Sequence, residues 1–222
     1  MRVKSLFALA ALAVLSGSLH SASAQMAPLR PDYLKPGDKV AVISPSYAPA
    51  QDDSTVFRAC EVLRSWGLVP VEGQFVRQGK NLDKDLGVKG LPFVLRYEDF
   101  LWALRDDEIK AIIPSRGGYG GIHFVDRLDL ADISAHPKWI VGYSDITNFH
   151  LAWYNAGVMS IHGNMCIDLC KQKGDEPSRN RLRDLLFGKV PIYNLPPEEN
   201  NIPGKAEGIL LGGNFITMEA LF

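Results

Sequence analysis

The sequence predicts an α/β fold in which a parallel sheet carries helices on both faces, as in Rossmann and flavodoxin-like domains. Two observations lead to this prediction. Short apolar runs alternate along the chain with longer segments of helical periodicity. The apolar runs are also nearly continuous, which is typical of parallel strands that are buried on both faces.

The elements can be placed in order along the chain. The first strand is expected in Lys39–Ser46, because an apolar run follows a Pro-Gly-Asp turn. A helix is expected at Asp53–Trp66, closed by Gly67 in the position of a C-terminal cap. Further strands are predicted at 68–71, 109–114, 139–142 and 158–162, further helices at 97–107 and 146–155, and a loop at 81–92.

Composition agrees with a folded globular protein and excludes several classes. The 222 residues are 46% hydrophobic and 22% charged, which argues against a disordered, collagen-like or coiled-coil chain. The 24 basic and 25 acidic residues nearly cancel, so the charge balance indicates no nucleic-acid partner.

Residues 1–24 have the pattern of an export signal. Arg2 and Lys4 precede the apolar run Leu6–Leu15, and Ala22-Ser23-Ala24 offers the small residues that a signal peptidase reads. The run is too short to span a bilayer as a helix, and no other stretch is long and apolar enough. We therefore expect a cleaved leader, no stable membrane insertion, and a periplasmic or secreted protein. The alternative is an unprocessed membrane anchor.

The remaining chain divides into three predicted parts. Residues 25–166 form an N-terminal α/β domain, and the charged, then proline-punctuated residues 167–203 form a linker. Residues 204–222 begin a second domain, with an apolar strand at Gly208–Asn214 and a helical pattern at Phe215–Phe222. Because the chain stops in mid-element, we expect this C-terminal domain to be incomplete.

Three cysteines leave metal binding and disulfide formation open. Cys60 falls on a helical apolar stripe, which favours a packed core residue. His162, Cys166 and Cys170 recur every four residues, and on a helix they would share one face. A structural zinc site usually needs a fourth ligand, so metal is the weaker interpretation. A Cys166–Cys170 disulfide would require an oxidising compartment.

A glycine-rich segment, Ser115–Gly121, follows the predicted strand 109–114 at a place where such sheets bind ligands. Four glycines between Gly117 and Gly121 allow backbone amides to approach a ligand closely. The dinucleotide fingerprint G-x-G-x-x-G fails, because His123 stands at its third glycine position, and no Walker motif is present. The alternative is a tight turn without a ligand.

A second polar segment, Gly142-Tyr-Ser-Asp-Ile146, follows the strand at 139–142. A serine at a sharp strand-to-helix turn is exposed, and the helix N-terminus favours developing negative charge. The hydrolase pattern G-x-S-x-G is incomplete, because position 146 is Ile. Ser144 is therefore a candidate nucleophile or, equally, a helix N-cap with Asp145 favouring the dipole.

A nucleophilic serine needs a base, which is usually a histidine held by an acid. The candidates after the leader are His123, His136, His150 and His162, and none has an obvious acidic partner in the sequence. His150 lies on the helix that follows Ser144, directed away from it, whereas His162 ends a strand of the same sheet. Ordinary surface or core roles are favoured for each.

Taken together, four motifs resemble the LD-carboxypeptidase family of serine peptidases. They are Ser115-Arg-Gly-Gly-Tyr-Gly, Gly142-Tyr-Ser-Asp-Ile-Thr147, His162-Gly163 and Gly212-Gly-Asn214, in that order. The resemblance runs from about Leu29 to the end of the chain and includes Lys35-Pro-Gly-Asp-Lys-Val.

The resemblance implies release of the terminal D-alanine from murein tetrapeptides, with Ser144 as the nucleophile. The oxyanion hole would combine the backbone NH of Asp145 with that of Gly118. We expect Arg116, Gly117 and Tyr119 of the glycine-rich segment to bind substrate. The family implies no metal or organic cofactor, and a homodimer is its usual oligomer.

The chain also departs from the family. The family's catalytic glutamate and histidine lie downstream of the Gly-Gly-Asn strand, where Glu207 and Glu219 fall too early to match. We therefore assign no base or acid, and we expect this chain to be inactive alone. Asn164 replaces the proline that often follows His-Gly. Two alternatives are a non-catalytic module that binds peptidoglycan peptides and, less favoured, a phosphate- or nucleotide-binding domain.

Overall fold

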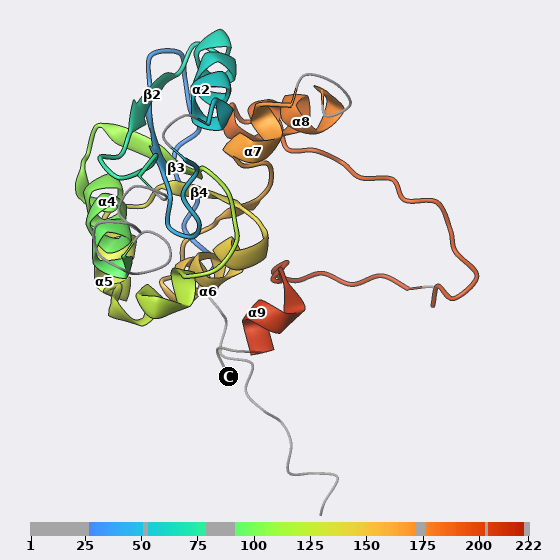
Figure 1. Cartoon of the computed structure of the whole chain (residues 1–222). Helices are drawn as coiled ribbons and strands as arrows, with labels where there is room; N and C mark the ends of the chain where they lie inside the picture. The colour runs from blue at the N-terminus through green and yellow to red at the C-terminus, as the bar shows by residue number, and fades with distance from the viewer. Residues whose placement is uncertain (1–26, 51–52, 79–91, 172–175, 203, 220–222) are drawn as a thin grey trace, which may run out of the picture.

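The computed structural model describes residues 27–50, 53–78, 92–171, 176–202 and 204–219. Its centre is a sheet of five parallel strands in the order β2-β1-β3-β4-β5 (Figure 1). This is the flavodoxin-like order, so the predicted α/β fold class is confirmed. The strands are β1 Lys39–Ile43, β2 Val69–Glu72, β3 Ile109–Pro114, β4 Trp139–Gly142 and β5 Ile161–His162.

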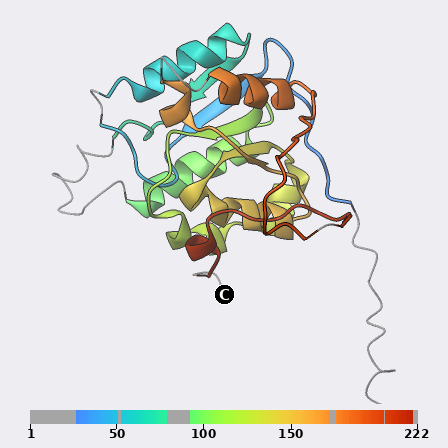
Figure 2. The same cartoon turned by 90° about the vertical axis from the view of Figure 1, so that its right-hand side faces the viewer.

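Helices cover both faces of the sheet and divide its core into two layers (Figures 1 and 2). Val40 and Val42 of β1 face one layer, and Ala41 and Ile43 face the other, as the two-residue period of a strand requires. The first layer is formed with α2 Thr55–Ser65, α7 Cys166–Leu169 and α8 Glu176–Leu186, and the second with α4 Phe93–Arg105, α5 Leu130–Ala135 and α6 Thr147–Asn155.

Helix boundaries follow local signals closely where glycine ends the helix. Gly67 has a φ of +85° and donates to the carbonyl of Arg64, so it caps α2 as predicted. Helix α4 instead begins at Phe93, four residues before the predicted start at 97. Its first turns bury Arg96 and Asp99, polar residues that a hydrophobic pattern does not place in a core. The predicted loop at 81–92 lies, except for its last residue, outside the described residues.

The segment 167–203 differs from the predicted linker in its first half. Helices α7 and α8 pack there, and Leu169, Leu182 and Leu186 are buried in the first core layer. Leu182 and Leu186 are four residues apart and share one helix face, so the charged residues around them line the exposed side. The N-terminal α/β unit therefore extends to Leu186.

Beyond Leu186 the described chain leaves the α/β unit in a wide, exposed, extended arc and returns beside α6 (Figure 1). The strand predicted at Gly208–Asn214 is not formed, because no neighbouring strand among the described residues pairs with it. The backbone NH of Asn214 instead donates to Thr147 Oγ1 at 2.9 Å. A short helix, α9 Phe215–Glu219, follows, and its Phe215 and Ile216 are exposed.

The structure confirms the predicted core position of Cys60 and contradicts the predicted helix face of His162, Cys166 and Cys170. Cys60 is buried in the first core layer, as its stripe predicts. His162 ends β5, whereas Cys166 begins α7, so the arrangement on one helix face is wrong. Gly163 and Asn164 interrupt the helical run between them. All three cysteines are free thiols.

The predicted leader, 1–24, lies outside the described residues. Among the residues that the structure does describe, no helix has the length and apolar character needed to cross a bilayer.

Candidate active site

The candidate site lies where the carboxyl ends of β1, β3 and β4 meet. In a sheet of this order, the crevice between β1 and β3 is where the direction of the connections reverses and where ligands bind. The hydroxyls of Ser44 and Ser115 lie 2.7 Å apart and join the two strand ends. The glycine-rich segment leaves β3 at this point, and the turn that holds Ser144 leaves the neighbouring β4.

Ser144 occupies a strained backbone position. Its φ is +60°, and it is the one non-glycine residue with positive φ in the described part of the chain. A side chain in this region costs roughly 1–3 kcal/mol, and such strain persists where the surrounding structure enforces it. A 3₁₀ turn, η3 Ser144–Ile146, then leads directly into α6. The arrangement has the geometry of a nucleophile elbow.

The N-cap alternative for Ser144 lacks its defining hydrogen bond. Neither η3 nor α6 shows a side-chain cap, and Ser144 Oγ bonds to no other described residue. The NH of Ile146 donates to the backbone carbonyl of Tyr143 instead. The hydroxyl is thus left for other chemistry, and the half-buried side chain is accessible from solvent.

The glycine-rich segment lies directly against Ser144. A Cβ on Gly117 would lie 3.2 Å from Ser144 Cβ and 3.4 Å from its Oγ. Gly118 has a φ of +130°, and a Cβ there would lie 2.5 Å from the Tyr47 ring. The NH groups of Gly118 and Asp145 donate no hydrogen bond to another described residue. Two backbone donors therefore remain available on either side of Ser144.

The carboxylate of Asp145 holds the two loops together. One oxygen, Oδ2, accepts from the Ser46 hydroxyl at 2.5 Å and from the Gly121 NH at 2.9 Å. The other, Oδ1, accepts from the Asn148 amide at 3.1 Å. Asp145 is buried, so these charge-assisted bonds act in a low-dielectric environment. Its side chain is structural, while its backbone NH is the predicted oxyanion donor.

Arg96 is a site residue that sequence reasoning missed. Its guanidinium Nη1 donates to the carbonyls of Ser46 and Tyr119, each at 3.3 Å, and so bridges the loops after β1 and β3. Arg96 is only 8% exposed, and its Nε has no partner in the described structure. Burial lowers the pKa of Arg96, and the nearby Asp145 carboxylate opposes that change.

Two of the predicted substrate-binding residues lie at the rim of the site. Arg116 and Tyr119 are exposed, and the Tyr119 ring meets His123 edge-on at 5.1 Å between centroids. Gly117 is buried beneath them against Ser144. The loop thus presents a cation and an aromatic ring to solvent beside the serine.

The histidines do not provide a visible base for Ser144. His150 is buried and has both nitrogens occupied: Nε2 lies 2.9 Å from the Gly142 carbonyl and Nδ1 lies 2.9 Å from Ser160 Oγ. Because a carbonyl can only accept, Nε2 carries the proton and Nδ1 accepts from Ser160. Burial lowers the pKa of His150 to about 4. His162 is exposed, and its ring lies 6.0 Å from that of His150.

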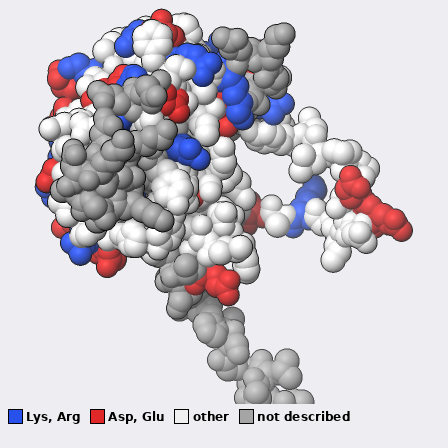
Figure 3. Space-filling view, in the orientation of Figure 1, with Lys and Arg blue, Asp and Glu red and all other residues white. Residues whose placement is uncertain are grey.

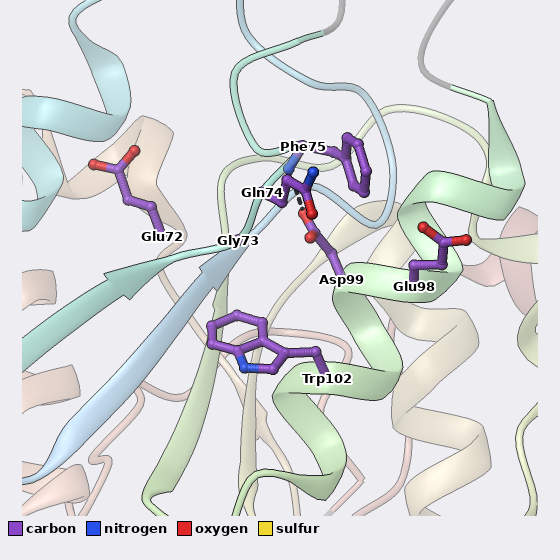
Figure 4. Close-up of a pocket in the computed structure, with 7 residues that line it drawn as sticks. All are labelled: Glu72, Gly73, Gln74, Phe75, Glu98, Asp99 and Trp102. Carbon is purple, nitrogen blue, oxygen red and sulfur yellow. Dashed lines mark hydrogen bonds between the residues drawn. The ribbon is translucent and has the colours of Figure 1, made fainter.

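A separate acidic hollow of about 340 Å³ lies at the end of β2, the edge of the sheet away from β4 (Figure 4). Its Asp99 Oδ2 accepts from the Phe75 NH at 3.0 Å, and burial raises the pKa of this carboxyl. Asp99 lies one turn after Arg96, so α4 anchors both the β2 end and the glycine-rich segment.

The fold and the elbow together define an α/β protein that presents a strained serine beside a glycine-rich loop. The chain belongs to the LD-carboxypeptidase family, because the model of that family's N-terminal domain matches residues 40–163. The matched range contains both the glycine-rich segment and Ser144. The family that the sequence motifs predict is therefore confirmed.

Curated relatives carry related names. A probable murein peptide carboxypeptidase of Bacillus subtilis is 33% identical over 189 residues, which cover 83% of this chain and 57% of the relative. The murein tetrapeptide carboxypeptidase of Pseudomonas aeruginosa is 27% identical over 195 residues, 82% of this chain and 60% of that protein. The chain thus spans about three-fifths of the length of these relatives.

Solved structures share the fold. An MccF-like protein from Bacillus anthracis superposes with a TM-score of 0.63 at 26% identity, over 71% of this chain and 47% of the other. The microcin C7 self immunity protein MccF, in complex with aspartyl sulfamoyl adenosine, gives a TM-score of 0.72 at 22% identity, over 88% and 66%.

Proposed function

We propose that this protein is a serine LD-carboxypeptidase that releases the terminal D-alanine from murein tetrapeptides during peptidoglycan turnover. The observation that carries the proposal is the strained Ser144, which lies against Gly117 with its hydroxyl uncommitted. The family membership and the names of the murein-directed relatives support the substrate class.

In this reaction Ser144 Oγ attacks the carbonyl carbon that precedes the D-alanine. The NH groups of Asp145 and Gly118 stabilise the resulting oxyanion, and each such donor contributes about 3–4 kcal/mol to the transition state. The tetrahedral intermediate then collapses, the C–N bond breaks, and D-alanine leaves with a proton on its nitrogen. Water hydrolyses the acyl-enzyme, which returns Ser144 to its starting state.

A base must take the proton from Ser144 Oγ, and an acid must supply the proton to the leaving nitrogen. The described residues place neither group beside Ser144. We therefore propose that these 222 residues supply the nucleophile and the oxyanion hole, and that they turn over poorly alone. Triad residues act as a unit, so a missing member lowers the rate by several orders of magnitude. In the cell we propose an exported, periplasmic or secreted protein that meets murein peptides there, as a homodimer.

The same lack of a base favours a second candidate, a non-catalytic module that binds peptidoglycan peptides. It keeps the crevice and the backbone donors but does not use Ser144 as a nucleophile. The two proposals differ in one respect: only the peptidase forms a covalent bond to Ser144.

The test incubates the full chain and its Ser144→Ala variant with a murein tetrapeptide ending in D-alanine. Mass spectrometry follows D-alanine release and the intact protein mass. Calorimetry compares binding of this tetrapeptide with binding of a matched peptide ending in L-alanine. Release or an acyl-protein adduct that Ser144→Ala abolishes establishes the peptidase. Selective binding with neither signal favours the module.

Absence of binding and release with folded protein would overturn both murein proposals. Because one structural relative was solved with aspartyl sulfamoyl adenosine, that compound is included as a competing substrate. Its cleavage, in the absence of tetrapeptide cleavage, would redirect the substrate assignment to acyl-amide conjugates.

A further inference from the structure

A small polar hollow of about 100 Å³ lies at the carboxyl end of β5, beside the candidate active site. Its polar lining comes from the strand end, from α8 and from the extended chain beyond α8. These residues are His162, Asn164, Ser178, Arg181 and Tyr193. No carboxylate lines the hollow, so its described lining carries no negative charge.

The register of the sheet places this hollow next to the serine elbow. Gly142 of β4 pairs with His162 of β5, and Ser144 follows Gly142 by two residues. The rings of Tyr143 and His162 lie 6.2 Å apart between centroids. A ligand bound at Ser144 can therefore extend a neighbouring group toward His162.

The side-chain NH₂ group of Asn164 is a free hydrogen-bond donor among the described residues. Its Oδ1 accepts from the Ser178 hydroxyl at 2.6 Å, which fixes the oxygen toward α8. The NH₂ group has two protons to donate and bonds to no other described residue.

Arg181 differs from its neighbours on α8 in having no acidic partner. Arg179 pairs with Glu176, and Arg183 pairs with Asp184. The Arg181 guanidinium makes no ion pair with a described residue and lies over the Tyr193 ring, 5.9 Å from its centroid. Figure 3 shows basic side chains over the part of the molecule where α8 lies.

We infer that this hollow is a carboxylate-binding subsite, in which the Arg181 guanidinium and the Asn164 amide hold the two oxygens of a substrate carboxylate. The guanidinium fork matches a carboxylate in a bidentate manner, and the volume suits a group of that size. The inference rests on the proposed function, because a murein tetrapeptide carries its terminal carboxylate one residue from the scissile carbonyl.

The first experiment measures binding in the Ser144→Ala background, which excludes turnover. The probes are N-acetyl-D-alanine, its uncharged amide, and inorganic phosphate, each titrated against the side-chain NH signals of Asn164 and Arg181 by NMR. N-acetyl-D-alanine should shift both signals and saturate, and the amide should not. Arg181→Gln and Asn164→Asp should each weaken binding about tenfold or more.

The matched control is Arg64→Gln, which removes an exposed arginine from α2 on another part of the surface. It should bind the probe as the parent does. The inference is overturned if the amide binds as well as the acid, if the Arg181 and Asn164 variants bind normally, or if phosphate binds more tightly than the carboxylate.

One further peptide identifies the source of the carboxylate, and one outcome separates this inference from the proposed function. A tetrapeptide amidated at its D-alanine should no longer shift the Arg181 signal if the subsite binds the terminal carboxylate. It should still shift that signal if the subsite binds a side-chain carboxylate. If N-acetyl-D-alanine binds here while neither D-alanine release nor an acyl adduct on Ser144 is ever observed, the subsite stands and the peptidase proposal fails in favour of the binding module.

Discussion

The carboxylate of Asp145 accepts a hydrogen bond from the backbone NH of Gly121, 24 residues earlier in the chain, at 2.9 Å. This bond joins the turn that strains Ser144 to the segment that carries Gly117 and Gly118. The position of one predicted oxyanion donor relative to the other thus depends on a buried side chain that is not itself expected to touch the substrate.

Asp145→Asn should destabilise the protein and loosen the glycine-rich segment. The amide loses the charge, and its NH₂ group can accept nothing from Ser46, Gly121 or Asn148. We expect a loss of about 2 kcal/mol in the free energy of unfolding, together with faster hydrogen exchange at Gly121. Urea denaturation and NMR exchange measure these quantities.

Asp132→Asn is the control for that prediction. It removes a carboxylate that pairs with the half-exposed Arg105 on the surface, and such pairs contribute at most about 1 kcal/mol. Equal losses in the two variants would show that the Asp145 network has no special role.

Ser144→Gly should be more stable than Ser144→Ala by about 1 kcal/mol. Both remove the hydroxyl, but only glycine adopts a φ of +60° without a steric penalty. Thermal and urea unfolding of the two variants give the comparison. If the alanine variant proves as stable as the glycine variant, Ser144 is not strained in solution.

Much of the sheet could be predicted from the sequence, because buried parallel strands are nearly uniformly apolar. Ile109–Pro114 and Trp139–Gly142 were predicted with the bounds that β3 and β4 have. The apolar segment Gly208–Asn214 satisfied the same pattern but forms no strand, because strands also need a partner for their backbone groups.

The site was predictable only where local motifs describe it. The turn at Ser144 follows from its position between a strand and a helix. Arg96 carried no such signal, because its two carbonyl partners lie 50 and 23 residues away in sequence. Long-range polar contacts of this kind have no period along the chain, so periodicity cannot reveal them.

Gly120→Ala should be one of the most damaging glycine substitutions in the described structure. Its φ is +130°, and a Cβ there would overlap the buried Arg96 guanidinium, which would have to give up its bonds to the Ser46 and Tyr119 carbonyls to make room. Strain and overpacking together should cost about 3 kcal/mol or more. Unfolding in urea measures the loss.

Gly157→Ala isolates the backbone contribution to that effect. Gly157 has a φ of +70° but nothing within 4 Å of its added Cβ, so only the conformational cost of about 1 kcal/mol applies. Similar losses at the two positions would mean that Arg96 gives way, and that it does not clamp the glycine-rich segment.

His150 should make the protein less stable as the pH falls from 6.5 toward 4. Burial lowers the pKa of the folded imidazole to about 4, whereas the unfolded side chain keeps its ordinary value of 6.5. Within this window the unfolded state binds a proton that the folded state does not, so acidification favours unfolding. At pH 5 the loss relative to pH 7.5 should reach roughly 2 kcal/mol.

The measurement compares urea unfolding at the two pH values for the parent, His150→Gln and His123→Gln. Glutamine cannot titrate but can still donate to the Gly142 carbonyl, so the pH dependence should shrink in His150→Gln alone. His123 is exposed and serves as the control. An NMR titration of the His150 ring gives the same answer directly: a pKa near 6.5 in the folded protein would mean that the ring is not held neutral beneath the serine elbow.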